Sequence, residues 1–231
     1  MNPYYESKGI TIYHNNYKNV IPFIGQVDVT ITDPPYGEQT HKGARSNTSG
    51  NKSPIDFACI NSEQYSELIS KILAITKRWV ISFSEWRFLS DAEKNGLPLV
   101  RFGIWIKPNP TPQFSGNMPG QGWEAIGIYH NNKIRKRWNG GGTSSVFNFS
   151  SDYLGLHPTA KPLKLLEELV KKFSDEGDVV LDPFMGSGTT LLVCKKLNRK
   201  AIGIEIEEKY CEMVAKRLGD TSKGNKKGIL F

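Results

Sequence analysis

The segment that most constrains the fold runs from residue 179 to residue 204. Residues 179–181 are apolar and β-branched, which predicts a buried strand, and a glycine-containing turn follows them. Residues 189–197 then carry the pattern of a helix, and residues 201–204 that of a second buried strand. A strand, a helix and a second strand of this length predict two parallel strands joined by a crossover helix.

The rest of the chain continues this alternation. Apolar patterns predict further strands at 27–32, 80–83, 99–106 and 124–129, and helices at 63–77, 162–173 and 207–218. Asn61 is expected to cap the helix at 63–77 with Gln64 as its capping-box partner, and Pro162 suits a first helical position. Strands separated by helices of this size predict an α/β fold, a mostly parallel sheet with helices on both faces.

Length and composition bound the class of protein. The 231 residues fit one domain, 1–231, and 38% hydrophobic residues suffice for a packed core. No stretch approaches the ~20 apolar residues that span a bilayer, and the first ten residues do not form a signal peptide. Cys59, Cys194 and Cys211 share no metal or redox spacing, so we expect reduced thiols in a cytoplasmic protein without a metal site.

The turn after residue 181 has the composition of a ligand site. It reads Asp182-Pro-Phe-Met-Gly-Ser-Gly188, and glycines allow a sharp turn and a close approach of a ligand to the backbone. Ligands of open α/β sheets bind at the carboxyl ends of strands. Glu205 ends the next strand about 20 residues on, where an acid can accept hydrogen bonds from ribose hydroxyls. On these residues alone, a dinucleotide would fit as well.

A second strand ends in Asp33-Pro34-Pro35-Tyr36. Two prolines in series donate no backbone N–H, so the Pro34 carbonyl is free to face a ligand beside the Asp33 carboxylate. Two neighbouring acceptors can hold both hydrogens of an amino group, and Tyr36 offers a ring on which a flat base can stack. The motif therefore indicates a site for an aromatic amine.

Together these motifs resemble the DNA amino-methyltransferases. Asp33–Tyr36 is similar to the family's catalytic signature, and residues 182–190 are similar to its cofactor signature. His157-Pro-Thr-Ala-Lys-Pro162 resembles the segment just upstream of the cofactor strand. The order of the three motifs is that of the β class, and their co-occurrence is more specific than any one of them.

The resemblance implies a Rossmann-like methyltransferase fold and S-adenosylmethionine as methyl donor, in a cytoplasmic enzyme of a bacterium, archaeon or phage. Asp33, Pro34, Pro35 and Tyr36 would form the catalytic loop that holds the target base, with Glu205 on the ribose hydroxyls. Thr159 and Lys161 would close over the methionine portion. The other residues expected to line the cofactor are Asn16, Asp33, Asp182, Phe184, Gly186, Gly188 and Thr189.

Asn16 marks a departure from the family. The family usually has a Gly-Asp pair at this point, whose aspartate binds the adenine amino group of the cofactor, and here Asn16 takes its place. An amide oxygen can accept the same hydrogen bond, but without charge assistance. We therefore expect a retained but weaker contact with the cofactor.

DNA is the expected partner, and the net charge of +7 suits a polyanion. Segment 37–56 is expected to be a mobile DNA-contacting loop, and segment 131–156 a short target-recognition segment. The candidate DNA-binding residues are Lys42, Arg45, Lys133, Arg135, Lys136, Arg137 and Trp138. A short recognition segment is consistent with a homodimer, and a cognate restriction endonuclease encoded elsewhere is a further expected partner.

The expected reaction is site-specific methyl transfer to N6 of adenine in DNA, after the base has been flipped out of the helix. N4 of cytosine is the nearest alternative, and Asp33 favours adenine because cytosine enzymes more often carry serine at that position. A nicotinamide-dependent oxidoreductase would leave residues 33–36 unexplained. A catalytically silent nucleic-acid-binding homologue, and RNA or a free nucleotide as substrate, stay open.

Overall fold

The computed structural model describes residues 1–36, 59–110, 116–117, 119–151 and 161–219. Within them one nine-stranded sheet has the order β1-β2-β9-β8-β3-β4-β6-β5-β7. The strands are β1 (Tyr5–Ser7), β2 (Ile10–His14), β3 (Val29–Thr32), β4 (Trp79–Ser84), β5 (Leu99–Ile106), β6 (Trp123–His130), β7 (Val146–Asn148), β8 (Val179–Asp182) and β9 (Lys200–Glu205). The helices are α1 (Tyr17–Val20), α3 (Ser62–Ile75), α4 (Trp86–Lys94), α5 (Leu163–Phe173), α6 (Thr189–Lys196) and α7 (Glu208–Gly219).

The sheet is mostly parallel, as the alternation of patterns predicts. Only β1 and β6 run against their neighbours, whereas β2, β9, β8, β3 and β4 pair in parallel. The strands predicted at 27–32, 80–83, 99–106, 124–129, 179–181 and 201–204 are all present within a residue or two. The patterns missed β1, β2, α1, α4 and β7, most of which are too short to show a period.

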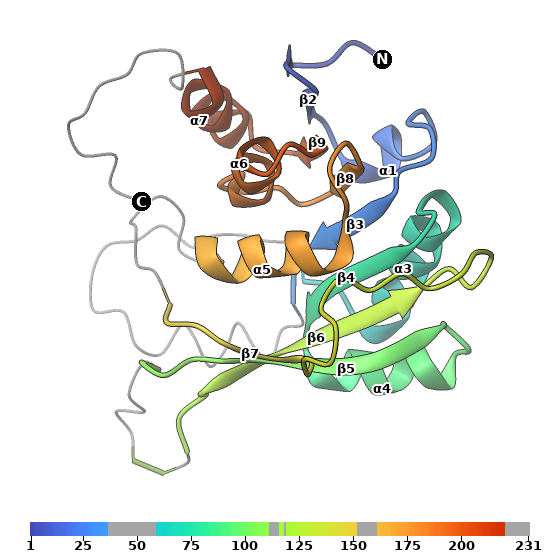
Figure 1. The fold of residues 1–231 in the computed structure, drawn as a ribbon, viewed down its shortest axis with the longest axis vertical. Helices are drawn as coiled ribbons and strands as arrows, with labels where there is room; N and C mark the ends of the chain where they lie inside the picture. The colour runs from blue at the N-terminus through green and yellow to red at the C-terminus, as the bar shows by residue number, and fades with distance from the viewer. Residues whose placement is uncertain (37–58, 111–115, 118, 152–160, 220–231) are drawn as a thin grey trace.

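Helices cover both faces of the sheet (Figure 1). On one face α5, α6 and α7 pack against alternate strand residues such as Ile31 and Ile81. On the other face α1, α3 and α4 pack against the intervening residues, among them Val80 and Leu181. This alternation is what parallel strands with helices on both sides require, because successive side chains point to opposite faces. The predicted α/β architecture is confirmed.

Local signals set two of the helix starts. Asn61 caps α3, and the capping box with Gln64 forms as predicted, with Asn61 Oδ1 accepting from the Gln64 N–H at 2.8 Å. Pro162 was expected at the first helical position of α5 but lies one residue earlier, at the cap. Its ψ of 136° is extended, so its carbonyl only begins the helix by accepting from the Leu166 N–H.

The chain reverses its direction of winding between β3 and β8. From β3 the next strand, β4, lies on one side, and from β8 the next strand, β9, lies on the other. Such a switch point opens a crevice at the carboxyl ends of the two central strands, where α/β proteins bind ligands. Here β3 ends at the Asp-Pro-Pro-Tyr loop and β8 ends at the glycine turn. The fold thus places the two motifs side by side.

Candidate active site

The catalytic loop holds its aspartate between two donors. Tyr36 donates its hydroxyl hydrogen to Asp33 Oδ1 at 2.9 Å, and the Lys161 ammonium donates to Asp33 Oδ2 at 2.5 Å. Pro34 is buried, while Asp33 and Tyr36 are half-buried at the end of β3. The structure therefore brings Lys161, which lies far along the sequence, to Asp33 and Tyr36 of the catalytic loop. The ammonium of Lys161, which was expected over the methionine portion of the cofactor, contacts the catalytic carboxylate, and its role toward the cofactor stays a prediction.

Two further charged residues complete this cluster, and sequence reasoning missed both. Glu124, on β6, contacts Lys161 at 3.3 Å and accepts from the Tyr36 hydroxyl at 3.2 Å. Lys107, which follows β5, donates to the other Glu124 oxygen at 2.5 Å. The sequence does mark both residues as unusual. Glu124 is an acid inside an otherwise apolar strand pattern, and Lys107 comes directly after another predicted strand. Only the pairing of β5 with β6 beside β4 shows that they reach Asp33.

The surroundings shift the pKa values of the two carboxyl groups of this cluster, Asp33 and Glu124, in opposite directions. Burial raises the pKa of Asp33, the charge of Lys161 opposes that rise, and the charge of Glu124 adds to it. Burial would also raise the pKa of Glu124, but the ammonium groups of Lys161 and Lys107 outweigh it and lower that pKa to about 2. Carboxyl groups whose pKa values are pushed apart take different roles, one as a fixed anion and one as a proton acceptor.

The Lys161 ammonium and the Tyr36 phenol keep their protons. The pKa of Lys161 is raised, because Asp33 and Glu124 together outweigh the lowering that burial alone would cause. Burial and the same two carboxylates raise the pKa of Tyr36 well above its ordinary value. The Lys161 ammonium also lies 4.9 Å from the centre of the Phe83 ring, a cation–π contact.

The glycine turn has a geometry that needs its glycines. Gly188 has φ +72°, and a Cβ there would lie 2.4 Å from Val214 Cγ1 on α7. Gly186, at φ +47°, donates its N–H to Glu205 Oε2 at 3.0 Å. The second oxygen of Glu205 accepts from the Glu207 N–H at 2.9 Å. The Glu205 carboxylate thus fixes the turn and keeps acceptor capacity for ribose hydroxyls.

A buried acid lies at the base of the turn. Asp182 is 5% exposed and accepts from the Phe184 N–H at 3.2 Å. Burial raises its pKa to about 7, with hydrogen bonds from Thr190 and Phe184 opposing the rise and the charges of Asp33 and Glu205 adding to it. Thr189 begins α6, and its hydroxyl lies 3.1 Å from that of Ser187. Asp182 is therefore electrostatically coupled to the catalytic loop.

The residues around the turn fit an adenosyl group that carries a positive charge. Parallel pairing brings His14 beside Glu205, so Asn16 reaches the same edge and caps α1 by accepting from the Lys18 N–H. Ile206, next to Glu205, is 59% exposed and offers an apolar surface. The hydroxyl of Thr32, buried just before Asp33, has no hydrogen-bond partner within the described residues. Acids, apolar surface and a spare polar atom are what such a ligand requires.

The predicted DNA-binding run at 133–137 does not lie beside Asp33. It follows β6, which is antiparallel, so His130 pairs with Trp79 at the amino end of β4. That end lies about 17 Å from Ser84, given ~3.3 Å per strand residue. Lys133, Arg135, Lys136, Arg137 and Trp138 therefore face the edge of the sheet opposite the catalytic loop. Their predicted contacts with DNA therefore concern a surface away from the catalytic loop, and the prediction that they bind DNA stays a prediction.

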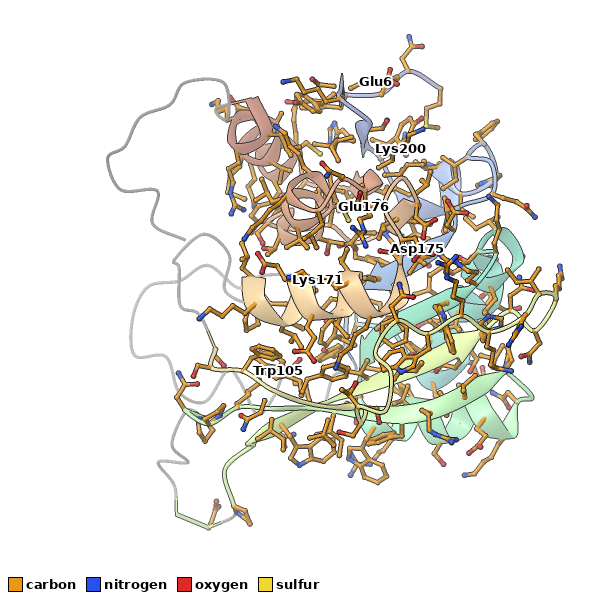
Figure 2. All side chains as sticks on the ribbon, in the orientation of Figure 1. Glu6, Trp105, Lys171, Asp175, Glu176 and Lys200 are labelled. Atoms are coloured by element: carbon orange, nitrogen blue, oxygen red, sulfur yellow. The ribbon has the colours of Figure 1, made fainter. Side chains whose placement is uncertain are left out.

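Trp138 and Arg137 of this segment pack against the helices and strands of the fold. Trp138 packs on the Phe173 ring with centroids 4.8 Å apart, and its indole N–H donates to the Gly141 carbonyl. The Arg137 carbonyl accepts from the Trp79 indole at 2.5 Å, and the Arg137 side chain contacts Asp175, which follows α5 (Figure 2). Trp138 is thus a packing residue of this edge.

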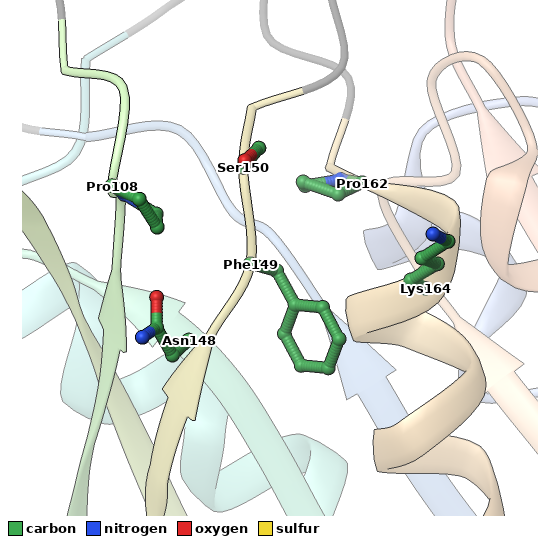
Figure 3. A pocket seen from close by; sticks show the side chains of 6 residues that line it. All are labelled: Pro108, Asn148, Phe149, Ser150, Pro162 and Lys164. Atoms are coloured by element: carbon green, nitrogen blue, oxygen red, sulfur yellow. The ribbon is translucent and has the colours of Figure 1, made fainter.

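The later part of segment 131–156 returns to the catalytic edge, because β7 runs parallel to β5. There a hollow of about 450 Å³ opens between the ends of β5 and β7 and the start of α5 (Figure 3). Its lining residues are Pro108, Asn148, Phe149, Ser150, Pro162 and Lys164. The connection between β5 and β6 leaves from the same edge at Lys107. Lys42, Arg45, Thr159 and segment 37–56 lie outside the described residues.

The described part of the chain offers neither a cluster of metal ligands nor a membrane-spanning helix. No group of three His, Cys, Asp or Glu side chains there could hold a metal ion. No helix there has the length and apolar character needed to cross a membrane.

The fold and the site define a class. A mostly parallel sheet carries a glycine turn and an Asp-Pro-Pro-Tyr loop on adjacent strands, the arrangement of an S-adenosylmethionine-dependent amino-methyltransferase. The family model for DNA methylases of the N6 and N4 type matches residues 135–216. The chain is 30% identical to type II methyltransferase M2.DpnII of Streptococcus pneumoniae, over 96% of this chain and 94% of that protein. The chain belongs to this DNA methylase family.

Other comparisons agree. Type II methyltransferase M2.LlaDCHI of Lactococcus lactis subsp. cremoris is 29% identical over 94% of this chain and 91% of its own length. The crystal structure of the M1.HpyAVI–SAM complex is similar with a TM-score of 0.68 and 29% identity, covering 90% of this chain and 99% of that one. The cytosine-N4-specific PvuII DNA methyltransferase has a TM-score of 0.74, 96% and 90% coverage and 14% identity, a likeness of fold alone.

Proposed function

We propose that this protein methylates N6 of adenine at specific sites in DNA, with S-adenosylmethionine as methyl donor. The observation that carries the proposal is the placement of Asp33 and the Asp182–Gly188 turn at the ends of adjacent strands, at the switch point of the sheet. One strand end holds a flat amine and the other a nucleoside, so donor and acceptor meet in one crevice. Membership of the DNA methylase family supports DNA as substrate.

Holding the amino group is the main task of the catalytic loop. The amino nitrogen of a base is a poor nucleophile because its lone pair is delocalised into the ring. Hydrogen bonds to Asp33 and to the Pro34 carbonyl draw it toward tetrahedral geometry and localise that pair. The donor, when bound, supplies an electrophilic methyl group on a sulfonium. Positioning of this kind contributes ~7–11 kcal/mol to lowering a barrier.

Asp33 also takes the proton. As the new N–C bond forms, the amino nitrogen becomes positive and loses one hydrogen to the Asp33 carboxylate, whose oxygens each keep a further lone pair beside the bonds from Tyr36 and Lys161. Burial raises the pKa of Asp33, which makes it a better acceptor than an exposed aspartate. Tyr36 keeps its hydroxyl on Asp33, and the face of its ring supports the base. The base has to be flipped out of the duplex, at a cost of a few kcal/mol.

The nucleoside product tests the proposal. DNA incubated with the purified protein and S-adenosylmethionine is digested and its nucleosides are identified by mass spectrometry, where we expect N6-methyl-2′-deoxyadenosine. Detection of N4-methyl-2′-deoxycytidine in its place would overturn the choice of adenine and assign the same mechanism to cytosine. Absence of any methylated nucleoside, with a folded protein that binds the donor, would favour the silent homologue. Modification-detecting sequencing of the same DNA then gives the recognition site.

Contacts with DNA are expected at the catalytic edge. Lys164 and the polar residues Asn148 and Ser150 line the hollow there, and the β5–β6 connection begins beside it. Segment 37–56 with Lys42 and Arg45 stays a predicted DNA-contacting loop. A homodimer, a cognate restriction endonuclease and a cytoplasmic location stay predictions. The spacing between modified sites and the mass of the protein on DNA, measured by light scattering, test the dimer.

A further inference from the structure

The proposed proton acceptor, Asp33, is the first of four charged side chains that contact one another in series. Asp33 contacts Lys161, Lys161 contacts Glu124, and Glu124 contacts Lys107, at 2.5, 3.3 and 2.5 Å. The four side chains come from the end of β3, the start of α5, β6 and the end of β5. Their exposed fractions are 25% or less. Two anions and two cations balance, so the removal of any one leaves a net charge beside Asp33.

The Tyr36 hydroxyl joins this series. It lies 2.9 Å from Asp33 Oδ1 and 3.2 Å from Glu124 Oε2, yet it carries one hydrogen. The two carboxylates therefore compete for that hydrogen, whereas the Lys161 ammonium has three hydrogens and its charge is shared between both carboxylates. Glu124 thus takes a share of the Tyr36 hydrogen and of the Lys161 charge, which leaves acceptor capacity on Asp33 for the amino group of the base.

We propose that Glu124 is a positioning residue for methyl transfer, which it serves by sharing Lys161 and Tyr36 with Asp33, and that Lys107 holds Glu124 in place. This inference rests on the proposed function, because it assigns roles around the same proton acceptor. Glu124 does not touch the base. It sets how strongly Lys161 and Tyr36 bind Asp33, and so how readily Asp33 accepts a proton.

The charges around Asp33 support this division of roles. Glu124 stays ionised, since its pKa is about 2, whereas the pKa of Asp33 is raised. The charged or titratable groups that interact with Asp33 are Lys161 just before α5, Glu124 on β6, Tyr36 on its own loop and Asp182 on β8. Among these Glu124 is the acid that two lysines hold as an anion. The proton of the reaction is thus directed to Asp33.

The test uses two substitutions that change the charge of the cluster in opposite senses. In Glu124→Gln the cluster gains a net positive charge, and Lys161 and Tyr36 bind Asp33 alone, so the pKa of Asp33 falls. In Lys107→Met the cluster gains a net negative charge and Lys161 is drawn toward Glu124, so the pKa of Asp33 rises. The profile of kcat against pH, measured on DNA with saturating donor, reports both shifts in its acidic limb.

We expect Glu124→Gln to lower kcat about tenfold or more, with the KM for the donor within about twofold of wild type. Its acidic limb moves to lower pH by about half a unit to one unit, and that of Lys107→Met moves to higher pH by a similar amount. Lys107→Arg keeps the charge and restores the wild-type limb. Asp28→Asn and Lys77→Met are the matched controls. Asp28 and Lys77 form an ion pair at 2.9 Å at the other end of β3, away from Asp33.

A role in folding alone would give a different result. The proposal would be overturned if the acidic limbs of the kcat–pH profiles stayed in place, or moved in the same direction in Glu124→Gln and Lys107→Met. A wild-type kcat in Glu124→Gln would also overturn it. Thermal melting and calorimetric titration with the donor show which variants are folded. If Glu124→Gln does not fold, the limbs of Lys107→Met and Lys107→Arg decide the question. If wild type transfers no methyl group, the proposed function itself fails; if wild type is active and these limbs do not move, only this inference fails.

Discussion

The two edges of the sheet use buried charge in different ways. At the carboxyl edge, Asp33 and Asp182 have raised pKa values, and burial is the largest cause for both. At the amino edge, Arg78 is held between Asp175 and Asp178, and the pKa of Asp175 is lowered because hydrogen bonds and cations outweigh its burial. The carboxyl edge thus holds acids whose pKa values are raised by burial, and the amino edge holds acids that are paired with arginine.

This difference indicates that the carboxyl edge serves catalysis and that the amino edge stabilises the fold. A carboxyl whose pKa is raised by burial costs stability and is kept where chemistry needs it. A carboxylate paired with arginine contributes to the fold and resists titration. The basic run at 133–137 belongs to the second kind, because the Arg137 side chain contacts Asp175 and its carbonyl accepts from Trp79. Substitutions at the two edges should therefore separate activity from stability.

The largest effect is expected at Asp33. Asp33→Ala removes one of the two acceptors for the amino group and the acceptor for its proton, so methyl transfer should fall about 10³-fold or more. The donor should still bind, because the glycine turn and Glu205 are untouched. Transfer of a radiolabelled methyl group to DNA measures the first quantity, and calorimetric titration measures the second. A rate within tenfold of wild type would remove Asp33 from the mechanism.

The reverse outcome is expected at Arg78. Its side chain is 10% exposed, and Arg78→Ala leaves the half-buried carboxylates of Asp175 and Asp178 without this cation, with only Arg137 still in contact with Asp175. We expect a loss of about 3–5 kcal/mol in the free energy of unfolding, measured with urea, and a wild-type kcat for the folded fraction. Lys77→Met breaks an exposed pair at the same edge and should cost about 1 kcal/mol or less. A large fall in kcat in folded Arg78→Ala would contradict the division between the edges.

Asp182 links stability to pH at the carboxyl edge. Its pKa is about 7 in the fold and about 3.9 in an unfolded chain, so between these values the folded protein holds a proton that the unfolded chain has released. Stability therefore falls as pH rises from about 4 to about 7, by at most about 4 kcal/mol. Asp182→Asn removes this dependence of the free energy of unfolding on pH. Urea unfolding of variant and wild type at pH 5 and at pH 8 measures the difference. Equal slopes in variant and wild type would disprove the buried titration.

The sequence predicted most of the architecture for a physical reason. Long apolar strands and helices carry a period, and the strand that precedes Asp33 and the helix that follows Gly188 have clear patterns. The two motifs were readable because a glycine turn and a double proline have few other uses at strand ends. That they lie side by side follows from the switch point, which depends on the strand order rather than on either motif.

What the sequence could not give is the direction in which β6 runs. The apolar pattern of a strand does not say at which edge of the sheet the next segment leaves it, so the sequence could not show that the basic run after β6 lies away from Asp33. The same antiparallel pairing brings Glu124 to Lys161 and Lys107, and no local signal announces a contact between residues so far apart. Interactions that depend on long-range strand pairing are those that single-sequence reasoning loses.

The smallest effect, and the finest separation of activity from stability, is expected at Asn16. It caps α1 by accepting from the Lys18 N–H at 2.9 Å, a role that aspartate fills equally well, so Asn16→Asp should change the free energy of unfolding by less than about 0.5 kcal/mol. A carboxylate accepts from the donor's adenine amino group with charge assistance, so the donor should bind about three- to tenfold more tightly. Calorimetric titration of both proteins measures this, and Asn15→Asp is the matched control. Weaker binding in Asn16→Asp would move the adenine away from α1 and leave Glu205 as the nearest polar anchor of the nucleoside.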